Sequence, residues 1–140
     1  MSLSSLKIRD TSGWTMCIFG VLAVLLGLVG LVSPETVLAL LGFEIIERSQ
    51  RLAGDYTLTF MAASSMASFN IGIYYVLAAL NNFKIFYLWT VPFRAVTFTV
   101  FTVLVVTGFA PTKFLGVGIW ELIGALATGL ALYFERKKAG

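Results

Sequence analysis

Four long apolar runs, separated by short polar segments, constrain this chain more than any other feature. The first extends from Trp14 to Val32 without a charged residue, which is close to the roughly 20 residues that cross a bilayer core. Only helices or a closed barrel satisfy their backbone polar groups in lipid. Charged residues make up 12% of the chain, against about 25% in a typical soluble domain. This composition excludes an ordinary soluble domain, a disordered chain and a nucleic-acid binder.

Helices fit the four runs better than strands do. Hydroxyl and apolar residues alternate in part over 97–103, as in a strand, but the other runs lack the repeated alternation of about ten residues that a barrel needs. We therefore predict an all-α integral membrane protein, an up-down-up-down four-helix bundle that forms one domain over 1–140. The predicted helices cover about 14–33, 53–80, 85–109 and 114–134.

A further short helix is predicted between the first two spans. Ser33, Pro34 and Glu35 form a typical helix start, with a capping hydroxyl, a proline at the first helical position and a carboxylate in the first turn. Gly42 is a typical helix end. A helix over 34–41 has about two turns and cannot cross a membrane, so we expect it to lie at the membrane surface.

The distribution of Lys and Arg predicts the orientation. The side that holds both termini and the loop after the second span carries six of these residues, and the opposite side carries three. The positive-inside rule then places both termini in the cytoplasm. The six are Lys7, Arg9, Lys84, Arg136, Lys137 and Lys138, and the three are Arg48, Arg51 and Lys113.

The lack of histidine and the single cysteine limit the chemistry that this chain can perform. The chain has no histidine, which removes the commonest general base and metal ligand. Its one cysteine, Cys17, lies in an apolar run and allows neither an intrachain disulfide nor a thiolate cluster. We expect no metal site and no cofactor, and we interpret Cys17 as a small packed hydrophobe.

Three polar residues on different predicted helices lie near mid-membrane. At about 1.5 Å per residue, Asn70 lies roughly 15 Å, Arg94 roughly 13–14 Å and Glu121 roughly 20 Å from the cytoplasmic helix ends. An isolated charge at that depth costs about 2.5–3.5 kcal/mol on insertion scales. We therefore predict that Arg94 and Glu121 contact each other, directly or through Asn70. The cluster either fixes the register of three helices or forms the polar floor of a ligand cavity.

Two more residues are candidates for that binding site. Tyr74, one turn beyond Asn70, offers a hydroxyl group. Asp55 is four residues after Arg51 near the outer start of the second span, where the two are expected to form an ion pair. The pair is either solvated or leaves Asp55 as an acid at an outer mouth of the cavity.

Small residues recur at helical spacing in several spans, which favours close helix association in lipid. We interpret these faces either as packing within the chain or as a docking surface for a second copy or a partner protein. The residues include Gly20, Gly27 and Gly30 in the first span, Gly54, Ser65, Ser68 and Gly72 in or near the second, and Gly118, Gly124, Ala125 and Gly129 in the fourth.

The segment Trp120-Glu121-Leu122-Ile123-Gly124-Ala125 resembles the E-x-x-G-A helix segment of DoxX-like four-helix membrane proteins. The match covers six residues, and the segment usually lies earlier in chains of that family. The layout also resembles, in outline, small four-helix scaffold proteins of sterol biosynthesis. The resemblance implies a four-helix membrane fold, and no functional residue is transferred from it.

Three functions are compatible with these features. The first is a small accessory or scaffold protein that contacts membrane partners, or a second copy, through its helices. The second is a membrane-embedded enzyme or binding protein for a hydrophobic small molecule, which uses the Glu121, Arg94 and Asn70 cluster. The third is a small dimeric exporter; the chain resembles compact multidrug transporters in size, but they carry an essential glutamate in the first helix, where this chain has no charge.

Overall fold

A computed structural model describes residues 7–139, and this part of the chain is helical. Four helices are long and apolar enough to cross a membrane, so the chain is a multi-pass integral membrane protein with the predicted fold class. The elements in order are α1 (Thr11–Val32), α2 (Pro34–Leu41), η2 (Arg48–Gln50), α3 (Thr57–Leu80), α4 (Lys84–Val106), η3 (Thr112–Phe114) and α5 (Leu115–Ala139).

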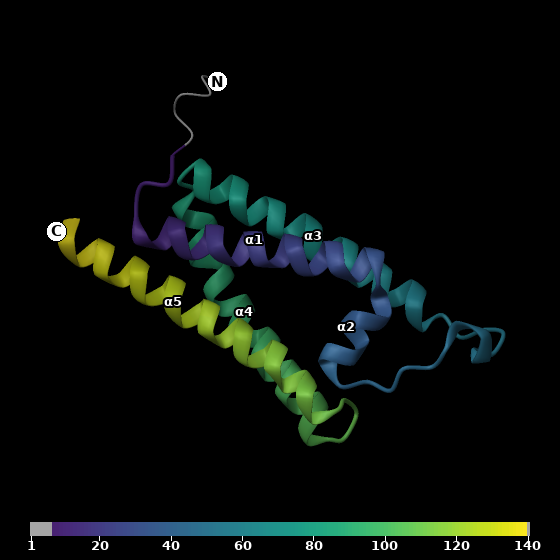
Figure 1. The fold of residues 1–140 in the computed structure, drawn as a ribbon. Helices are drawn as coiled ribbons and strands as arrows, with labels where there is room; N and C mark the ends of the chain where they lie inside the picture. The colour runs from purple at the N-terminus through teal and green to yellow at the C-terminus, as the bar shows by residue number, and fades with distance from the viewer. Residues whose placement is uncertain (1–6, 140) are drawn as a thin grey trace.

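The four long helices form two pairs that diverge from one another. Helix α1 packs along α3 and α4 packs along α5, while α1 and α5 make the principal contact between the pairs. The pairs approach each other at the end that carries the described termini and separate toward the other end (Figure 1). Since α3 and α4 barely touch, the bundle is open along that side.

Small residues bring α1 and α3 together. A Cβ added to Gly27 would lie 2.7 Å from two backbone atoms of α3, the Phe69 nitrogen and the Ser65 oxygen. A Cβ on Gly20 would lie 2.8 Å from the Gly72 oxygen. These glycines therefore serve packing within the chain, one of the two interpretations offered by the sequence.

The short helix α2 closes the wide end between the two pairs. Its bounds match the prediction, with Pro34 in the first turn and Gly42 ending it at a φ of +84°. The Ser33 hydroxyl does not cap the backbone as expected; it bonds the Thr36 hydroxyl at 2.7 Å. Beyond the helix, the Phe43 ring meets the Phe114 ring edge-on, with 5.9 Å between centroids, so α2 is joined to the loop before α5.

Helix α1 begins and α4 ends about three residues before the predicted bounds, and two other ends differ by more. Helix α3 begins at Thr57 rather than near residue 53, because Gly54 has a φ of +94° and the Asp55 carboxylate accepts the Thr57 N–H at 2.9 Å. Helix α5 continues past Phe134 to Ala139. The charges after Phe134 end the apolar run without ending the helix, since Lys and Arg are good helix formers and suit a C-terminus.

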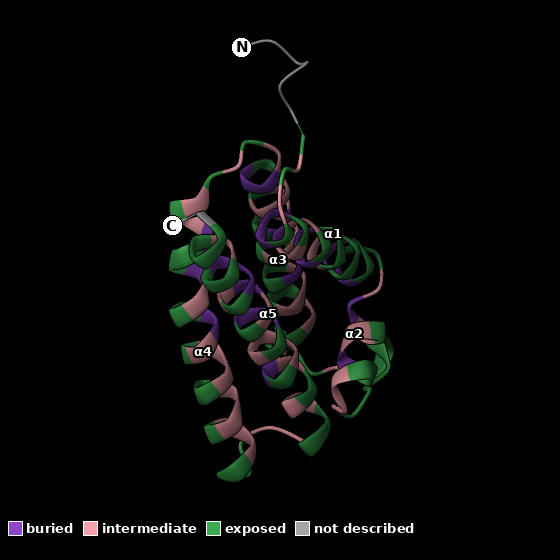
Figure 2. Cartoon of the chain, turned by 90° about the vertical axis from the view of Figure 1, so that its left-hand side faces the viewer, coloured by how far each residue is buried: buried purple, intermediate pink, exposed green. Residues whose placement is uncertain are grey.

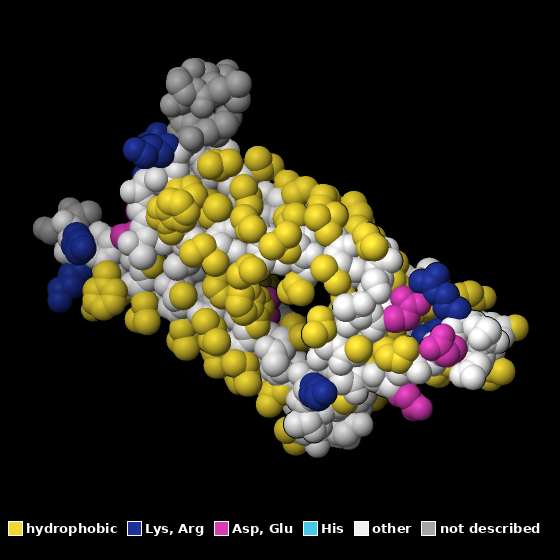
Figure 3. Space-filling model, in the orientation of Figure 1, with side chains coloured by type: hydrophobic (Ala, Val, Ile, Leu, Met, Phe, Trp, Pro, Cys, Tyr) yellow, Lys and Arg dark blue, Asp and Glu magenta, His cyan; other side chains and the backbone are white. Residues whose placement is uncertain are grey.

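The distribution of buried and exposed residues fits a protein surrounded by lipid. Buried residues lie on the inward faces of the helices, while exposed residues cover their outer sides (Figure 2). The exposed middle of the molecule is largely apolar, and Lys and Arg side chains gather at its two ends (Figure 3). The packed core lies near the end that carries the termini and comprises Met16, Ala78, Ala79, Tyr87 and Leu132.

An ion cluster that the sequence analysis missed joins three helices beside this core. The Lys84 ammonium at the start of α4 lies 2.5 Å from both the Asp10 and the Glu135 carboxylates. The Ser12 amide donates to Glu135 at 2.7 Å, and Asp10 caps α1 by accepting the Gly13 N–H at 2.8 Å. Burial raises the pKa of Asp10, but Lys84 and the Gly13 amide outweigh it and hold that pKa below its usual value.

This cluster predicts a pH dependence. Because the pKa of Asp10 is lowered on folding, its contribution to stability is present above the unfolded value of about 3.9 and is lost as the pH falls through the folded value. Lys84→Met should reduce the free energy of unfolding by about 1–2 kcal/mol at neutral pH. It should also weaken the loss of stability at acid pH. Thermal unfolding in detergent from pH 3 to 7 measures both effects. Lys137→Met, which changes an exposed lysine at the same end of the molecule, is the control. Parallel curves for the wild type and Lys84→Met would contradict the assignment.

Candidate functional site

A cavity of about 680 Å³ lies between the two helix pairs, with walls from all four long helices. Figure 3 shows a hollow in the middle of the apolar surface. Most of the lining is apolar and aromatic, and a few polar side chains interrupt it. The lining residues used below are Phe19, Tyr74, Tyr75, Trp89, Arg94, Trp120 and Glu121.

Arg94 is the buried charge of this cavity. Helix α4 continues through Pro92 and places the Arg94 side chain inward, where it is only 4% exposed. Its guanidinium carbon lies 4.4 Å from the centre of the Phe19 ring and 4.8 Å from that of Tyr75, within the range of cation–π attraction. Its Nε and Nη1 atoms are buried and form no hydrogen bond with any residue of the described range, 7–139.

Glu121 of α5 faces this guanidinium, as predicted. Its Oε2 lies 3.6 Å from Arg94 Nε, which is close enough for an ion pair but too long for a hydrogen bond. The Glu121 side chain is 25% exposed, so it borders the open part of the cavity. One turn further along α5, Gly124 leaves the space that Arg94 Nη1 occupies; any side chain there would collide with it.

The other predicted site residues have different positions. Tyr74 lines the cavity and is largely exposed. Among the residues that the structure describes, no hydrogen bond joins Asn70 to Arg94 or Glu121, and Asn70 is absent from the cavity wall. The predicted bridge through Asn70 therefore does not form.

Asp55 lies in the loop before α3, away from the cavity wall. It accepts a hydrogen bond from Arg51 at 2.7 Å, so the predicted pair forms, although in a loop rather than on a helix. The Thr57 hydroxyl and amide, with a smaller contribution from Arg51, hold the pKa of Asp55 below its usual value. These contacts explain Asp55 as a residue that shapes the entry to α3.

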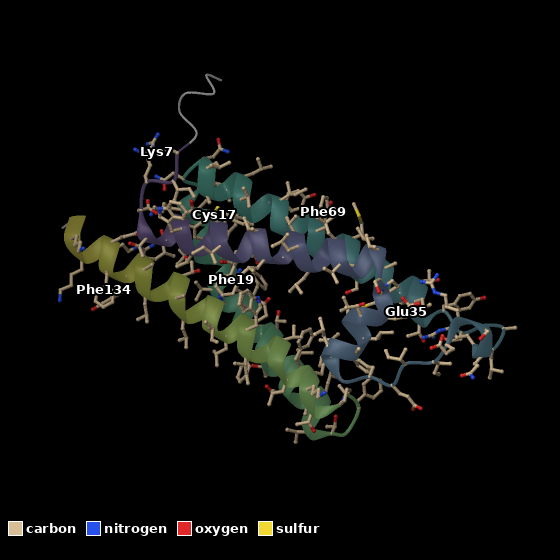
Figure 4. All side chains as sticks on the ribbon, in the orientation of Figure 1. Lys7, Cys17, Phe19, Glu35, Phe69 and Phe134 are labelled. Atoms are coloured by element: carbon tan, nitrogen blue, oxygen red, sulfur yellow. The ribbon has the colours of Figure 1, made fainter. Side chains whose placement is uncertain are left out.

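The aromatic walls were not recognised as part of the site from the sequence. The Phe19 ring contacts both Arg94 and Trp120, with 4.2 Å between the Phe19 and Trp120 centroids. Figure 4 shows Phe19 in the region between α1 and α5. Trp89 and Trp120 also line the cavity. Aromatic residues are common throughout such chains, so only their position relative to Arg94 distinguishes these.

The arrangement is suited to binding an apolar molecule that carries a polar group. Such sites are mostly apolar cavities of roughly 300–1,000 Å³ with a few placed polar groups. Within the described residues, no cluster of three Cys, Asp or Glu side chains is placed to hold a metal ion. No protein-family model, curated protein or solved structure matches this chain.

Proposed function

We propose that this chain is a membrane-embedded binding protein for a hydrophobic small molecule, held in the cavity between the two helix pairs. The observation that carries the proposal is the buried Arg94 guanidinium, with two unpartnered nitrogens, on the wall of a 680 Å³ cavity. A buried donor without a partner costs about 1–3 kcal/mol, and more when it is charged. A ligand that accepts a hydrogen bond from the Arg94 guanidinium would offset part of this cost.

The alternative of a scaffold protein has less support from the packing. It was based in part on small-residue faces, and in α1 and α3 these faces pack against each other through Gly20, Gly27 and Gly72. A bundle that served only as a scaffold would gain stability by closing around its core. The separation of α3 from α4 instead leaves a route from the surrounding lipid to the cavity.

Native mass spectrometry of the protein, purified in mild detergent, tests the proposal. The wild type is expected to carry a bound molecule of defined mass. Ala67→Trp places a large ring in the cavity and should abolish that adduct. Ala63→Trp, one turn away on α3 and outside the cavity wall, is the matched control and should keep it. An identical adduct pattern in both variants would count against the cavity as the binding site.

The orientation is part of the same proposal: both termini face the cytoplasm, because six Lys and Arg residues lie on their side and three on the other. Single cysteines in a Cys17→Ser background test it with an impermeant maleimide on sealed cells. Gln50→Cys, in η2, should react from outside, whereas Lys138→Cys and Ser4→Cys should not; Ser4 lies outside the described residues. External labelling of Lys138→Cys would reverse the orientation.

A further inference from the structure

We infer that the ligand of this cavity is electrically neutral and presents a carbonyl-type oxygen acceptor to Arg94. This inference rests on the proposed function and specifies its ligand class. It begins from the hydrogen-bonding state of the guanidinium, since arginine has N–H donors and no acceptor. Its buried Nε and Nη1 lack partners, so a group that satisfies them has to be an acceptor.

Charge balance indicates that the acceptor is neutral. Glu121 lies 3.6 Å from Arg94 Nε, and the two formal charges cancel. Among the residues that the structure describes, no other charged side chain lines the cavity. A carboxylate or phosphate ligand would place a second negative charge beside Glu121 in an apolar setting, where like charges repel strongly. A carbonyl oxygen accepts from Arg94 without that penalty.

The walls determine the rest of the ligand. The rings of Phe19 and Tyr75 face Arg94, and the rings of Trp89 and Trp120 also line the cavity. These rings favour apolar and especially flat partners, which stack at low cost. A ketone or ester on an apolar body meets both requirements, whether it is a free small molecule or the ester region of a bilayer lipid.

Three naphthalene probes of nearly equal shape distinguish the contributions of the acceptor oxygen, the ligand charge and the apolar body. 2-Acetylnaphthalene is neutral with an acceptor, 2-ethylnaphthalene lacks the oxygen, and 2-naphthoate is an anion. Affinities are measured by calorimetry at pH 7 with the protein in nanodiscs of diether lipid, which has no ester carbonyl, and empty nanodiscs correct for partition. We expect the ketone to bind about tenfold more tightly than either other probe, the scale of one hydrogen bond from a charged donor.

The variant that removes both charges, Arg94→Met with Glu121→Leu, should bind the ketone and the hydrocarbon equally. Equal affinities in the wild type would overturn the inference, and tighter binding of naphthoate would overturn its neutrality. The proposed function fails separately, if 2-ethylnaphthalene binds the wild type no better than it binds Ala67→Trp.

Repeating the ketone titration in nanodiscs of diester lipid distinguishes the two sources of the acceptor. Weaker apparent binding there supports a bilayer lipid that competes through its ester carbonyl. Unchanged binding supports a free small molecule as the ligand.

Discussion

Glu121→Leu should destabilise the protein by about 3–5 kcal/mol, the usual cost of breaking a buried ion pair from one side. The change leaves the Arg94 guanidinium, 4% exposed, without a counter-charge. Arg94→Met should cost less, because the carboxylate that remains is 25% exposed at the cavity. The double variant should recover much of the loss, since apolar replacements for both partners are often near neutral.

A double-mutant cycle on thermal unfolding in detergent measures this coupling. The exposed pair Arg48–Glu35, at 2.6 Å with the Arg48 side chain 70% exposed, is the matched control. Its cycle should give about 0–1 kcal/mol, as surface ion pairs do. A coupling for Arg94 and Glu121 no larger than that of the control would show that the two charges are stabilised independently.

Gly27→Ala should separate α1 from α3 at the middle of their contact. The new Cβ would lie 2.7 Å from the Ser65 oxygen and the Phe69 nitrogen, and backbone atoms cannot move aside as a side chain can. We expect a loss of about 1–3 kcal/mol, the usual cost of overpacking.

Gly116→Ala is the matched control for this substitution. It lies in α5, and apart from its own helical turn no atom of the described residues comes within 4 Å of the added Cβ. Replacing a helical glycine there should stabilise by up to about 1 kcal/mol. Thermal unfolding of the two variants beside the wild type provides the comparison. Equal stabilities for Gly27→Ala and Gly116→Ala would contradict the close α1–α3 packing.

The helices were predictable because span length and apolar character are local properties of the chain. Their ends were less so: Asp55 and Gly54 delay the start of α3, and the charged end of α5 stays helical. The Lys84 cluster was missed because its residues lie far apart in the sequence. From the sequence, Lys84 indicated only the orientation of the chain.

The Arg94–Glu121 pair was predictable because two deep charges on different helices require partners. The depth of a residue in the membrane gives its height along the helix, but it does not show which way the side chain faces around the helix axis. Asn70 has the right depth, but at about 100° per residue it lies roughly a quarter turn from the middle of the α3 face that lines the cavity. Phe19 gave no signal and Gly124 was noted only as a small residue, since the roles of both depend on the guanidinium beside them.

The central claim, that the cavity admits an apolar molecule, is tested most directly by NMR of the three tryptophan indole N–H groups in nanodiscs. Trp89 and Trp120 line the cavity, whereas Trp14 lies outside its wall. On titration with 2-ethylnaphthalene, we expect saturable shifts and probe-to-protein NOEs at Trp89 and Trp120, with Trp14 unchanged. Equal, non-saturating shifts at all three indoles would mean that the probe only partitions into the lipid, and would contradict the account.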